Sequence, residues 1–356
     1  MMKALFFLNS FAGGGAERVC LNLAQKLHEM NVDSDFVTIY NKKPAYSLPE
    51  YIHVLSLEIE DKPLASLKIM KAVPIVNEFI SGKSYLLITA HLQPSYLLAS
   101  LTKVGEKCFY VVHGSFYRRK VIDFWVYGIG LRLCLKGKKL VTVSEGLKFE
   151  LENHGFNSKD IRIVYNPCPV ACIRADPKSK SPHVRKYILV MGRLEKVKNP
   201  LLALELFYQG RFYDKYDLIY LGQGSLCKSI KKQIAKYNLQ EYVFLPGFQN
   251  NPVPWIKNAS LLLSCSKYEG LPMNLVEALV CGIPVVAVDC PYGPSEILTG
   301  KLANYLIHPM EKLSEMNSVI ASALESYPEV DSTYYDKFNV EHITQIYLSL
   351  WKEMFE

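Results

Sequence analysis

Two glutamates, Glu269 and Glu277, lie eight positions apart around the expected start of a helix. The apolar run 259–265 before them is typical of a buried strand, and Pro272 suits the first turn of a helix, where its missing N–H costs nothing. We therefore expect Glu269 in the loop and Glu277 on the helix just past its first turn. The unpaired N–H groups and partial positive charge of a helix start can bind a diphosphate.

Carboxylates on both sides of a diphosphate suit a ligand that carries many hydroxyl groups. An ionised carboxylate only accepts hydrogen bonds, so one glutamate can hold a ribose and the other a sugar at the far end of the diphosphate. The alternative interpretation is an ordinary helix start with acidic residues near its positive end. The candidate donor-binding positions of this segment are Glu269, Gly270, Leu271, Pro272, Met273, Asn274 and Glu277.

A basic pair, Arg193 and Lys198, follows the apolar run 187–192. Open α/β sheets bind ligands at their carboxyl edge, and both side chains should emerge there. Arg can direct two donors at one phosphate and Lys adds a point charge, so the pair can neutralise a leaving diphosphate without a metal. The alternative interpretation is a solvated basic turn.

Glycines end several other expected strands. Gly14 and Gly15 follow the first strand, and their missing side chains let backbone N–H groups approach an anion or a sugar. Their spacing is not the G-x-G-x-x-G of a dinucleotide-binding fold, and a glycine-rich turn is as often only a turn. Residues after later strands that could approach the nucleotide or its base are Gly222, Gly224, Gly247 and Phe248.

His113 ends the expected strand 108–113. A single histidine is more often structural than functional. Its position favours function, because it should face the same edge as the glycine loop at 13–15.

No metal ion or other cofactor is expected. The pattern Asp33-x-Asp35 has the form used in metal-dependent sugar transfer, but it precedes its strand and should lie at the opposite edge of the sheet. The nine cysteines are scattered in apolar segments, as in a reduced protein without disulfides. Cys168 and Cys172 form a close pair without the second pair that a zinc site needs.

Most of the formal net charge of +7 lies in the first 165 residues, and one segment there combines basic ends with an aromatic middle. Such a pattern fits a helix on an anionic membrane surface. The alternatives are a helix packed on its own domain with a solvated rim, and nucleic acid, for which no motif is present. The basic residues are Arg118, Arg119, Lys120, Arg132, Lys136, Lys138 and Lys139.

The elements that must position these residues alternate between apolar strand-like runs and amphipathic helices. This alternation predicts α/β architecture with parallel sheets. A length of 356 residues fits two domains, and the piece 166–184, rich in Pro, Ser and Lys, is the expected linker. No apolar run approaches the ~18 residues that span a bilayer. Leu5–Leu8 is too short for a signal peptide, so we interpret it as a buried strand.

With these motifs in order, the chain resembles the retaining glycosyltransferases of family 4, over nearly its whole length. Residues 269–277 resemble the family's E-x7-E motif, and 192–199 its G-R-L-x-x-x-K-N segment. Residues 13–18 are similar to its amino-terminal glycine loop, and 338–341 to its carboxyl-terminal signature. Four ordered matches are more specific than any one of them.

The resemblance implies a GT-B fold, with two Rossmann-like domains that face a cleft and a last helix that crosses back to the first domain. We expect an acceptor domain of residues 1–166 with the helix 340–356, and a donor domain of residues 167–339. The resemblance further implies that Arg193 and Lys198 bind the diphosphate, Glu277 the ribose and Glu269 the donor sugar. It assigns to His113 a contact with the transferred sugar, and to Gly14 and Gly15 contacts with donor or acceptor.

Residues 289–297 resemble members that build bacterial surface polysaccharides from UDP-sugars. The implied reaction moves a hexose or N-acetylhexosamine from a UDP-sugar to a hydroxyl of a lipid-linked saccharide, without metal and with retention of configuration. The enzyme would then be cytoplasmic and peripheral on the inner face of the membrane. Two alternatives stay open: a catalytically silent sugar-nucleotide-binding subunit, and another GT-B activity such as epimerisation or phosphorolysis.

Overall fold

The computed structural model describes residues 2–45, 48–61, 65–115, 132, 134–176 and 180–355. The chain divides into two compact units, Met1–Cys168 with Phe338–Glu356, and Pro169–Lys337. From the sequence we expected 1–166 with 340–356, and 167–339. The two divisions differ by two residues at each boundary.

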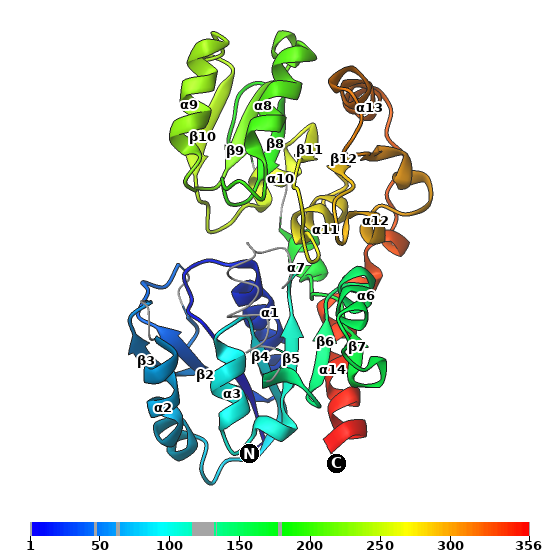
Figure 1. Cartoon of the computed structure of the whole chain (residues 1–356). Coiled ribbons are helices and arrows are strands. Elements are labelled where there is room, and N and C mark those ends of the chain that lie inside the picture. The colour runs from blue at the N-terminus through cyan, green and yellow to red at the C-terminus, as the bar shows by residue number, and fades with distance from the viewer. Residues whose placement is uncertain are drawn as a thin grey trace. The chain divides into compact units, whose positions relative to one another are not determined.

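The first unit is built on a parallel sheet, as the alternation of apolar runs and helices predicts. Among the described residues the sheet has seven strands in the order β3-β2-β1-β4-β5-β6-β7, and every neighbouring pair is parallel. Figure 1 shows this sheet. Its strands are β1 (Lys3–Leu8), β2 (Asp33–Tyr40), β3 (Ile52–Ile59), β4 (Tyr85–His91), β5 (Phe109–Val112), β6 (Lys139–Thr142) and β7 (Ile161–Ile163).

Helices of the first unit bury one face each. In α1 (Gly15–Glu29) the repeat Val19, Leu23 and Leu27 places apolar side chains on one stripe, and all three are buried. The other described helices are α2 (Ala65–Phe79), α3 (Ser95–Leu101), α6 (Glu145–Asn153) and α14 (Val340–Phe355).

The last helix, α14, packs on the first unit (Figure 1). It contacts α1 and β4, and the ring of Trp351 lies 5.9 Å from that of Phe109 on β5. Where the chain returns, Cys168 N donates to Phe338 O at 2.6 Å and Val340 N donates to Cys168 O at 2.9 Å. The prediction that the terminal helix returns to the first domain is confirmed.

The second unit repeats the architecture. Its sheet has the order β10-β9-β8-β11-β12-β13, again with parallel neighbours. The strands are β8 (Tyr187–Met191), β9 (Asp217–Leu221), β10 (Val243–Gly247), β11 (Leu261–Ser264), β12 (Val285–Val288) and β13 (Leu306–Ile307). The sequence missed β13 because a strand of two residues produces no apolar run. The α-helices are α7 (Val170–Ala175), α8 (Pro200–Gln209), α9 (Cys227–Lys236), α10 (Val253–Lys257), α11 (Met273–Val280), α12 (Pro294–Ile297) and α13 (Leu313–Glu325).

A buried carboxylate anchors the amino edge of the first sheet. Asp35, near the start of β2, is fully buried and accepts hydrogen bonds from Lys3 Nζ at 2.9 Å and Lys83 Nζ at 2.8 Å. Tyr85 Oη donates to the same carboxylate at 2.8 Å. Burial by itself would raise the pKa of Asp35, but the three donors outweigh burial and hold the pKa below its ordinary value.

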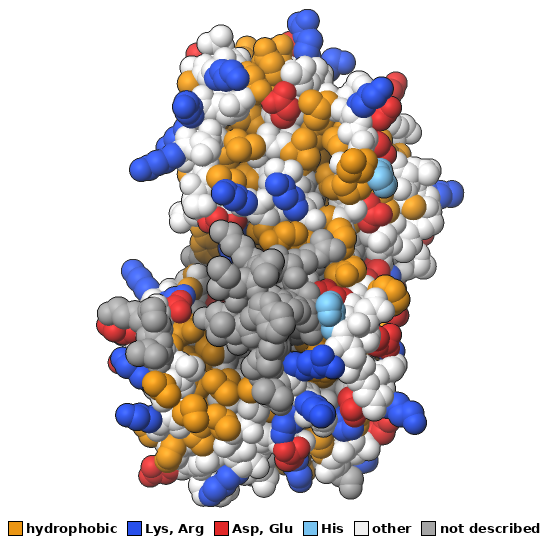
Figure 2. Space-filling model, in the orientation of Figure 1, with side chains coloured by type: hydrophobic (Ala, Val, Ile, Leu, Met, Phe, Trp, Pro, Cys, Tyr) orange, Lys and Arg blue, Asp and Glu red, His pale blue; other side chains and the backbone are white. Residues whose placement is uncertain are grey.

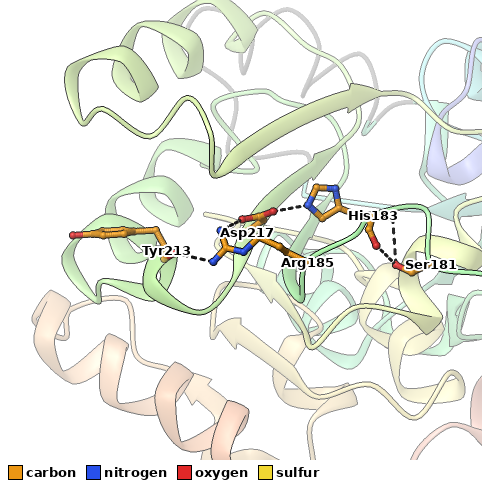
Figure 3. A network of polar contacts seen from close by, with 5 residues as sticks. All are labelled: Ser181, His183, Arg185, Tyr213 and Asp217. Atoms are coloured by element: carbon orange, nitrogen blue, oxygen red, sulfur yellow. Dashed lines mark hydrogen bonds and ion pairs between the residues drawn. The ribbon is translucent and has the colours of Figure 1, made fainter.

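The second sheet has a matching network at its amino edge, drawn in Figure 3. Asp217, the first residue of β9, is 2% exposed and pairs with His183 Nε2 at 2.5 Å and Arg185 Nη1 at 2.7 Å. Arg185 Nη2 also donates to the backbone oxygen of Tyr213 at 3.2 Å. Ser181 Oγ donates to the backbone oxygen of His183 at 2.6 Å. The network ties the segment before β8 to the start of β9.

In the described part of the chain, no helix is both long enough and apolar enough to span a membrane.

Replacing Asp35 by Asn should lower the free energy of unfolding at pH 7 by about 2 to 4 kcal/mol, because two lysines lose a buried partner. In the parent protein the same contribution is present above the ordinary carboxyl pKa and is lost as the pH falls through the lowered native pKa. Urea denaturation measures both effects.

The control is Asp61→Asn, since Asp61 pairs with Lys42 at 2.9 Å on the surface, with side chains 55% and 43% exposed. Its cost should stay below about 1 kcal/mol. Equal costs for the two variants would contradict the role assigned to the buried network.

Candidate active site

The loops after β8 and β9 meet backbone to backbone at the carboxyl edge of the second sheet. Gly222 has φ +152°, and a Cβ there would lie 2.0 Å from the backbone oxygen of Gly192. A Cβ on Gly224 would lie 2.4 Å from the backbone oxygen of Leu194. These positions accept only glycine, and the close approach fixes where Arg193 leaves the sheet.

Lys198 and Glu269 form an ion pair in this region. The distance from Nζ to Oε1 is 2.5 Å, and the side chains are 25% and 11% exposed. Ser266 Oγ donates to the same carboxylate oxygen at 2.6 Å. The sequence predicted a diphosphate ligand for Lys198 and a sugar for Glu269, which are adjacent parts of one molecule. The structure brings these two side chains, 71 positions apart in the chain, into direct contact.

Backbone hydrogen bonds hold Glu269 in its loop before α11. Its N–H donates to Pro291 O at 3.0 Å, and its own oxygen accepts from Tyr292 N at 3.1 Å. On the preceding loop, Lys267 N donates to Val197 O at 2.8 Å, next to Lys198. Backbone hydrogen bonds therefore fix the chain at Glu269 and next to Lys198.

The helix start at α11 is joined to the end of β8. Asn274 Nδ2 donates to Met191 O at 3.1 Å. Glu277 lies on α11 past its first turn, as predicted, and is partly buried. Pro272 caps the helix instead of occupying its first turn, because the helix begins at Met273. Our placement of this proline was wrong by one residue.

The turn Gly270–Leu271 packs against Gly293. A Cβ on Gly293, which has φ +102°, would lie 3.0 Å from Gly270 O and from Leu271 Cα. Leu271 is 6% exposed, so its side chain belongs to the packing of the turn. The backbone of this turn, and not its side chains, is what a ligand could contact.

A shallow pocket lies beside these residues, and its empty volume of about 260 Å³ includes open solvent. It is lined by Arg193 and Lys198 from the loop after β8, and by Ser264 and Ser266 from the end of β11. Arg193 is exposed, and Lys198 lies deeper. Two cations and two hydroxyls around one pocket can bind a phosphate group by charge and hydrogen bonds.

The neighbouring strand end carries Gly247 and Phe248. Gly247 ends β10 with φ +86°, and a Cβ there would lie 3.4 Å from Gln223 Nε2 of the adjacent loop. Phe248 follows it and is 41% exposed. The strand order β10-β9-β8-β11 therefore gathers the predicted nucleotide-binding positions of this unit along one edge.

In the first unit, the glycine loop is occupied by the chain's own carboxylate. The N–H groups of Gly13 and Gly14 donate to Glu17 Oε2 at 2.6 and 2.9 Å, and Ser10 Oγ donates to Oε1 at 3.2 Å. Glu17 is 7% exposed. The N–H of Gly14 is therefore bonded within the loop, and the contact of Gly14 and Gly15 with a donor or acceptor stays a prediction. Gly15 begins α1 next to it.

His113 directly follows β5 and contacts a second histidine. Its Nε2 lies 2.8 Å from Nδ1 of His91, the last residue of β4. His91 is fully buried, and its Nε2 lies 2.8 Å from Thr89 Oγ1. Burial lowers the pKa of His113 to about 4, and lowers that of His91 as well, so both rings are neutral at pH 7. The sequence analysis missed His91, although a histidine that closes a buried strand was visible at 85–91.

The acidic pattern at Asp33 and Asp35 lies at the amino edge of the first sheet, as expected, where Asp35 is bonded to Lys3, Lys83 and Tyr85. Groups of three or more His, Cys, Asp or Glu suited to a metal do not occur in the described ranges.

The predicted basic segment is described only in part, since Arg118, Arg119 and Lys120 lie outside the described residues. Arg132 and Lys136 are exposed. Lys138 pairs with Glu106, and Lys139 with Asp160, which neutralises part of the predicted charge.

Comparison with protein families decides the assignment. Residues 13–171 match the model described as Glycosyltransferase Family 4, and residues 173–336 match Glycosyl transferases group 1. The two models follow one another along almost the whole chain. This chain is a family 4 glycosyltransferase.

Two curated relatives of this glycosyltransferase are named as bacterial sugar transferases. It is 27% identical to the N-acetylgalactosamine-N,N'-diacetylbacillosaminyl-diphospho-undecaprenol 4-alpha-N-acetylgalactosaminyltransferase of Campylobacter jejuni, over 83% of each chain. It is also 27% identical to the lipopolysaccharide 1,6-galactosyltransferase of Salmonella typhimurium, over 56% of this chain and 59% of that one.

Solved structures share the fold of the glycosyltransferase. Anabaena HepE, in complex with UDP and glucose, matches with a TM-score of 0.78 and 17% identity over 99% of this chain and 100% of that one. The apo lipopolysaccharide outer core galactosyltransferase WaaB matches with a TM-score of 0.72 and 20% identity over 99% of each chain. The fold is GT-B, as the resemblance implied.

Proposed function

We propose that this glycosyltransferase moves a hexose or N-acetylhexosamine from a UDP-sugar to a hydroxyl of a lipid-linked saccharide in bacterial surface glycan assembly. The observation that carries the proposal is the ion pair of Lys198 with Glu269, because Lys198 and Arg193 also line one pocket. Lys198 supplies a cation for the diphosphate, and Glu269 beside it supplies an acceptor for the hydroxyls of the sugar.

The proposed reaction exchanges one bond for another on the same face of the sugar. The bond from C1 to the diphosphate oxygen breaks, and its electron pair stays on that oxygen. The bond from C1 to the acceptor oxygen forms, and the acceptor hydroxyl gives its proton to the leaving diphosphate. Arg193 and Lys198 stabilise the charge that develops on the diphosphate. Glu269 holds the sugar, Glu277 the ribose, and His113 contacts the transferred sugar.

Other predicted positions complete the proposed donor site. The backbone around the start of α11 faces the diphosphate. The glycines at strand ends allow close approach of the nucleotide, and Phe248 flanks the base. The remaining proposed donor-contacting positions are Gly14, Gly15, Gly222, Gly224, Gly247, Gly270, Leu271, Pro272, Met273 and Asn274.

The choice of donor and acceptor is supported by the relatives. HepE was crystallised with UDP and glucose, and the Campylobacter enzyme is named for a diphospho-undecaprenol-linked acceptor. A lipid-linked acceptor requires that the enzyme reach a membrane surface, so we propose peripheral binding on its cytoplasmic face.

Two surfaces of the first unit favour such binding. One carries Arg132 and Lys136, two exposed residues from the described part of the predicted basic segment. The other is the outer face of α2, and Figure 2 shows hydrophobic side chains gathered over α2 and α3. Apolar side chains with lysines beside them suit an anionic lipid interface. On α2 the exposed residues are Leu67, Met70 and Ile75, each more than half exposed, together with Lys68 and Lys71.

The direct test incubates the isolated chain with a panel of UDP-sugars, with and without a lipid-linked saccharide. Transfer yields UDP and an extended glycan only when the acceptor is present. An epimerase would isomerise the donor without an acceptor, and a silent subunit would bind the donor and release nothing. Either of those results would replace the proposed function.

Lys198→Ala should reduce kcat/KM by roughly tenfold to over a hundredfold, because about 1.5 to 3 kcal/mol of stabilisation of the leaving diphosphate is lost. Initial rates of UDP release measure this. The control is Lys196→Ala, an exposed lysine of the same loop, which should keep its rate. Full activity of the Lys198 variant would remove this residue from the site.

Glu269→Gln should have opposite effects on nucleotide binding and on turnover. Loss of the carboxylate frees Lys198, so UDP should bind about two- to fivefold more tightly, the scale expected for a partly exposed ion pair. Sugar transfer should fall, since the sugar loses an acceptor. Calorimetric titration with UDP checks the first effect, with Glu325→Gln on α13 as an exposed control. Weaker UDP binding by Glu269→Gln alone would contradict the arrangement.

The proposed reaction needs no divalent metal, because the cationic pair supplies the charge that a metal would bring. Adding excess EDTA should therefore leave the transfer rate within about twofold of its value in untreated enzyme, whatever the magnesium content of the buffer. Activity that vanishes with EDTA and returns with manganese would reverse this part of the proposal.

A further inference from the structure

Three polar side chains form a continuous chain of hydrogen bonds inside the first unit. Thr89 and His91 are two residues apart on β4, so both project from the same face of the sheet. Thr89 Oγ1 lies 2.8 Å from His91 Nε2, and His91 Nδ1 lies 2.8 Å from His113 Nε2. Thr89 and His91 are fully buried, whereas His113 is partly exposed.

A hydrogen bond between two imidazole nitrogens constrains both rings. One nitrogen must carry the proton and the other must be bare, and each neutral ring holds one N–H. Either His91 donates from Nδ1, which leaves His113 with its proton on Nδ1, or His113 donates from Nε2, which leaves its Nδ1 bare. Nδ1 is the ring nitrogen of His113 that lies outside this chain of hydrogen bonds. The first arrangement therefore presents an N–H donor to a ligand at Nδ1, and the second presents a bare nitrogen that accepts.

The hydroxyl of Thr89 discriminates between the two arrangements. Within the described residues, His91 is the one hydrogen-bond partner that the structure gives to Thr89 Oγ1. If the hydroxyl accepted from His91, its own proton would be buried without an acceptor, which is costly. If the hydroxyl donates to His91 Nε2, both its own proton and the proton on His91 Nδ1 have an acceptor. His91 then carries its proton on Nδ1 and donates to His113.

We propose that Thr89 and His91 act as positioning residues that fix His113 as the tautomer with its proton on Nδ1. His113 thereby presents an N–H donor to an oxygen of the transferred sugar. The contact with the sugar rests on the proposed function, whereas the tautomer follows from the first unit alone.

This arrangement excludes His113 as a general base. Its Nε2 accepts from His91, its Nδ1 already holds a proton, and burial keeps the ring neutral with a pKa of about 4. The exclusion agrees with a reaction in which the acceptor proton leaves with the diphosphate. A donor at this position can stabilise an oxygen of the sugar without competing for that proton.

The test uses the matched variants Thr89→Val and Thr89→Ser. Valine keeps the shape of threonine and suits a buried strand, but it removes the hydroxyl; serine keeps the hydroxyl. The first measurement is nitrogen-15 NMR of protein labelled at its eight histidines, with the His113 signals assigned by comparison with His113→Gln. The parent and Thr89→Ser should show a protonated Nδ1 and a bare Nε2 at His113. Thr89→Val should show a mixture of the two tautomers.

The second measurement is sugar transfer by the same proteins. Thr89→Val should lower kcat about two- to fivefold, in proportion to the share of His113 that loses its proton on Nδ1, with UDP affinity and melting temperature near those of the parent. Thr89→Ser should restore most of the rate. A variant that loses UDP binding and kcat together would indicate a structural role and overturn the assignment.

The two measurements separate the inference from the function on which it rests. If the parent transfers no sugar with any donor, but NMR shows the predicted tautomers, the proposed function fails and the hydrogen-bond chain stands. If His113 in the parent carries its proton on Nε2, or if Thr89→Val leaves its tautomer unchanged, the inference fails whatever the activity.

Discussion

The parallel direction of all neighbouring strands is the constraint on which the rest of this structure depends. When strands run parallel, every chain segment that leaves them at the carboxyl end leaves at the same edge. In the second unit this edge gathers Arg193, Lys198 and the glycines at 222 and 247. In the first unit it gathers the glycine loop, His91 and His113. The topology of the sheet alone therefore brings together residues that are distant in sequence.

The two edges of each sheet use charge differently. At the amino edges, Asp35 and Asp217 are buried and each pairs with two basic side chains, which holds the starts of the strands together. At the carboxyl edge of the second sheet, Lys198 and Glu269 are paired but remain partly accessible. A ligand can therefore compete for the second kind of pair. It cannot reach Asp35 or Asp217 without unfolding the edge.

Much of the fold could be predicted from the sequence because its signals are local. The expected strands 187–192 and 108–113 agree with β8 and β5 to within one residue at each end, and β13 was missed because it has two residues. The placement of Glu269 in a loop and Glu277 on α11 also followed from local pattern. Which side chains touch could not be predicted in this way. The pairing of Lys198 with Glu269, the occupation of the glycine loop by Glu17 and the contact of His91 with His113 depend on how the strands align in space.

The central claim is that Lys198, which pairs with Glu269, binds the diphosphate of the donor. A crystal structure with a bound UDP-sugar tests it most directly. The account predicts Lys198 Nζ within hydrogen-bond distance of an oxygen of the β-phosphate, with Arg193 at the same phosphate and Glu269 at a hydroxyl of the sugar. A nucleotide bound elsewhere, or a diphosphate that leaves Lys198 bonded only to Glu269, would contradict the account.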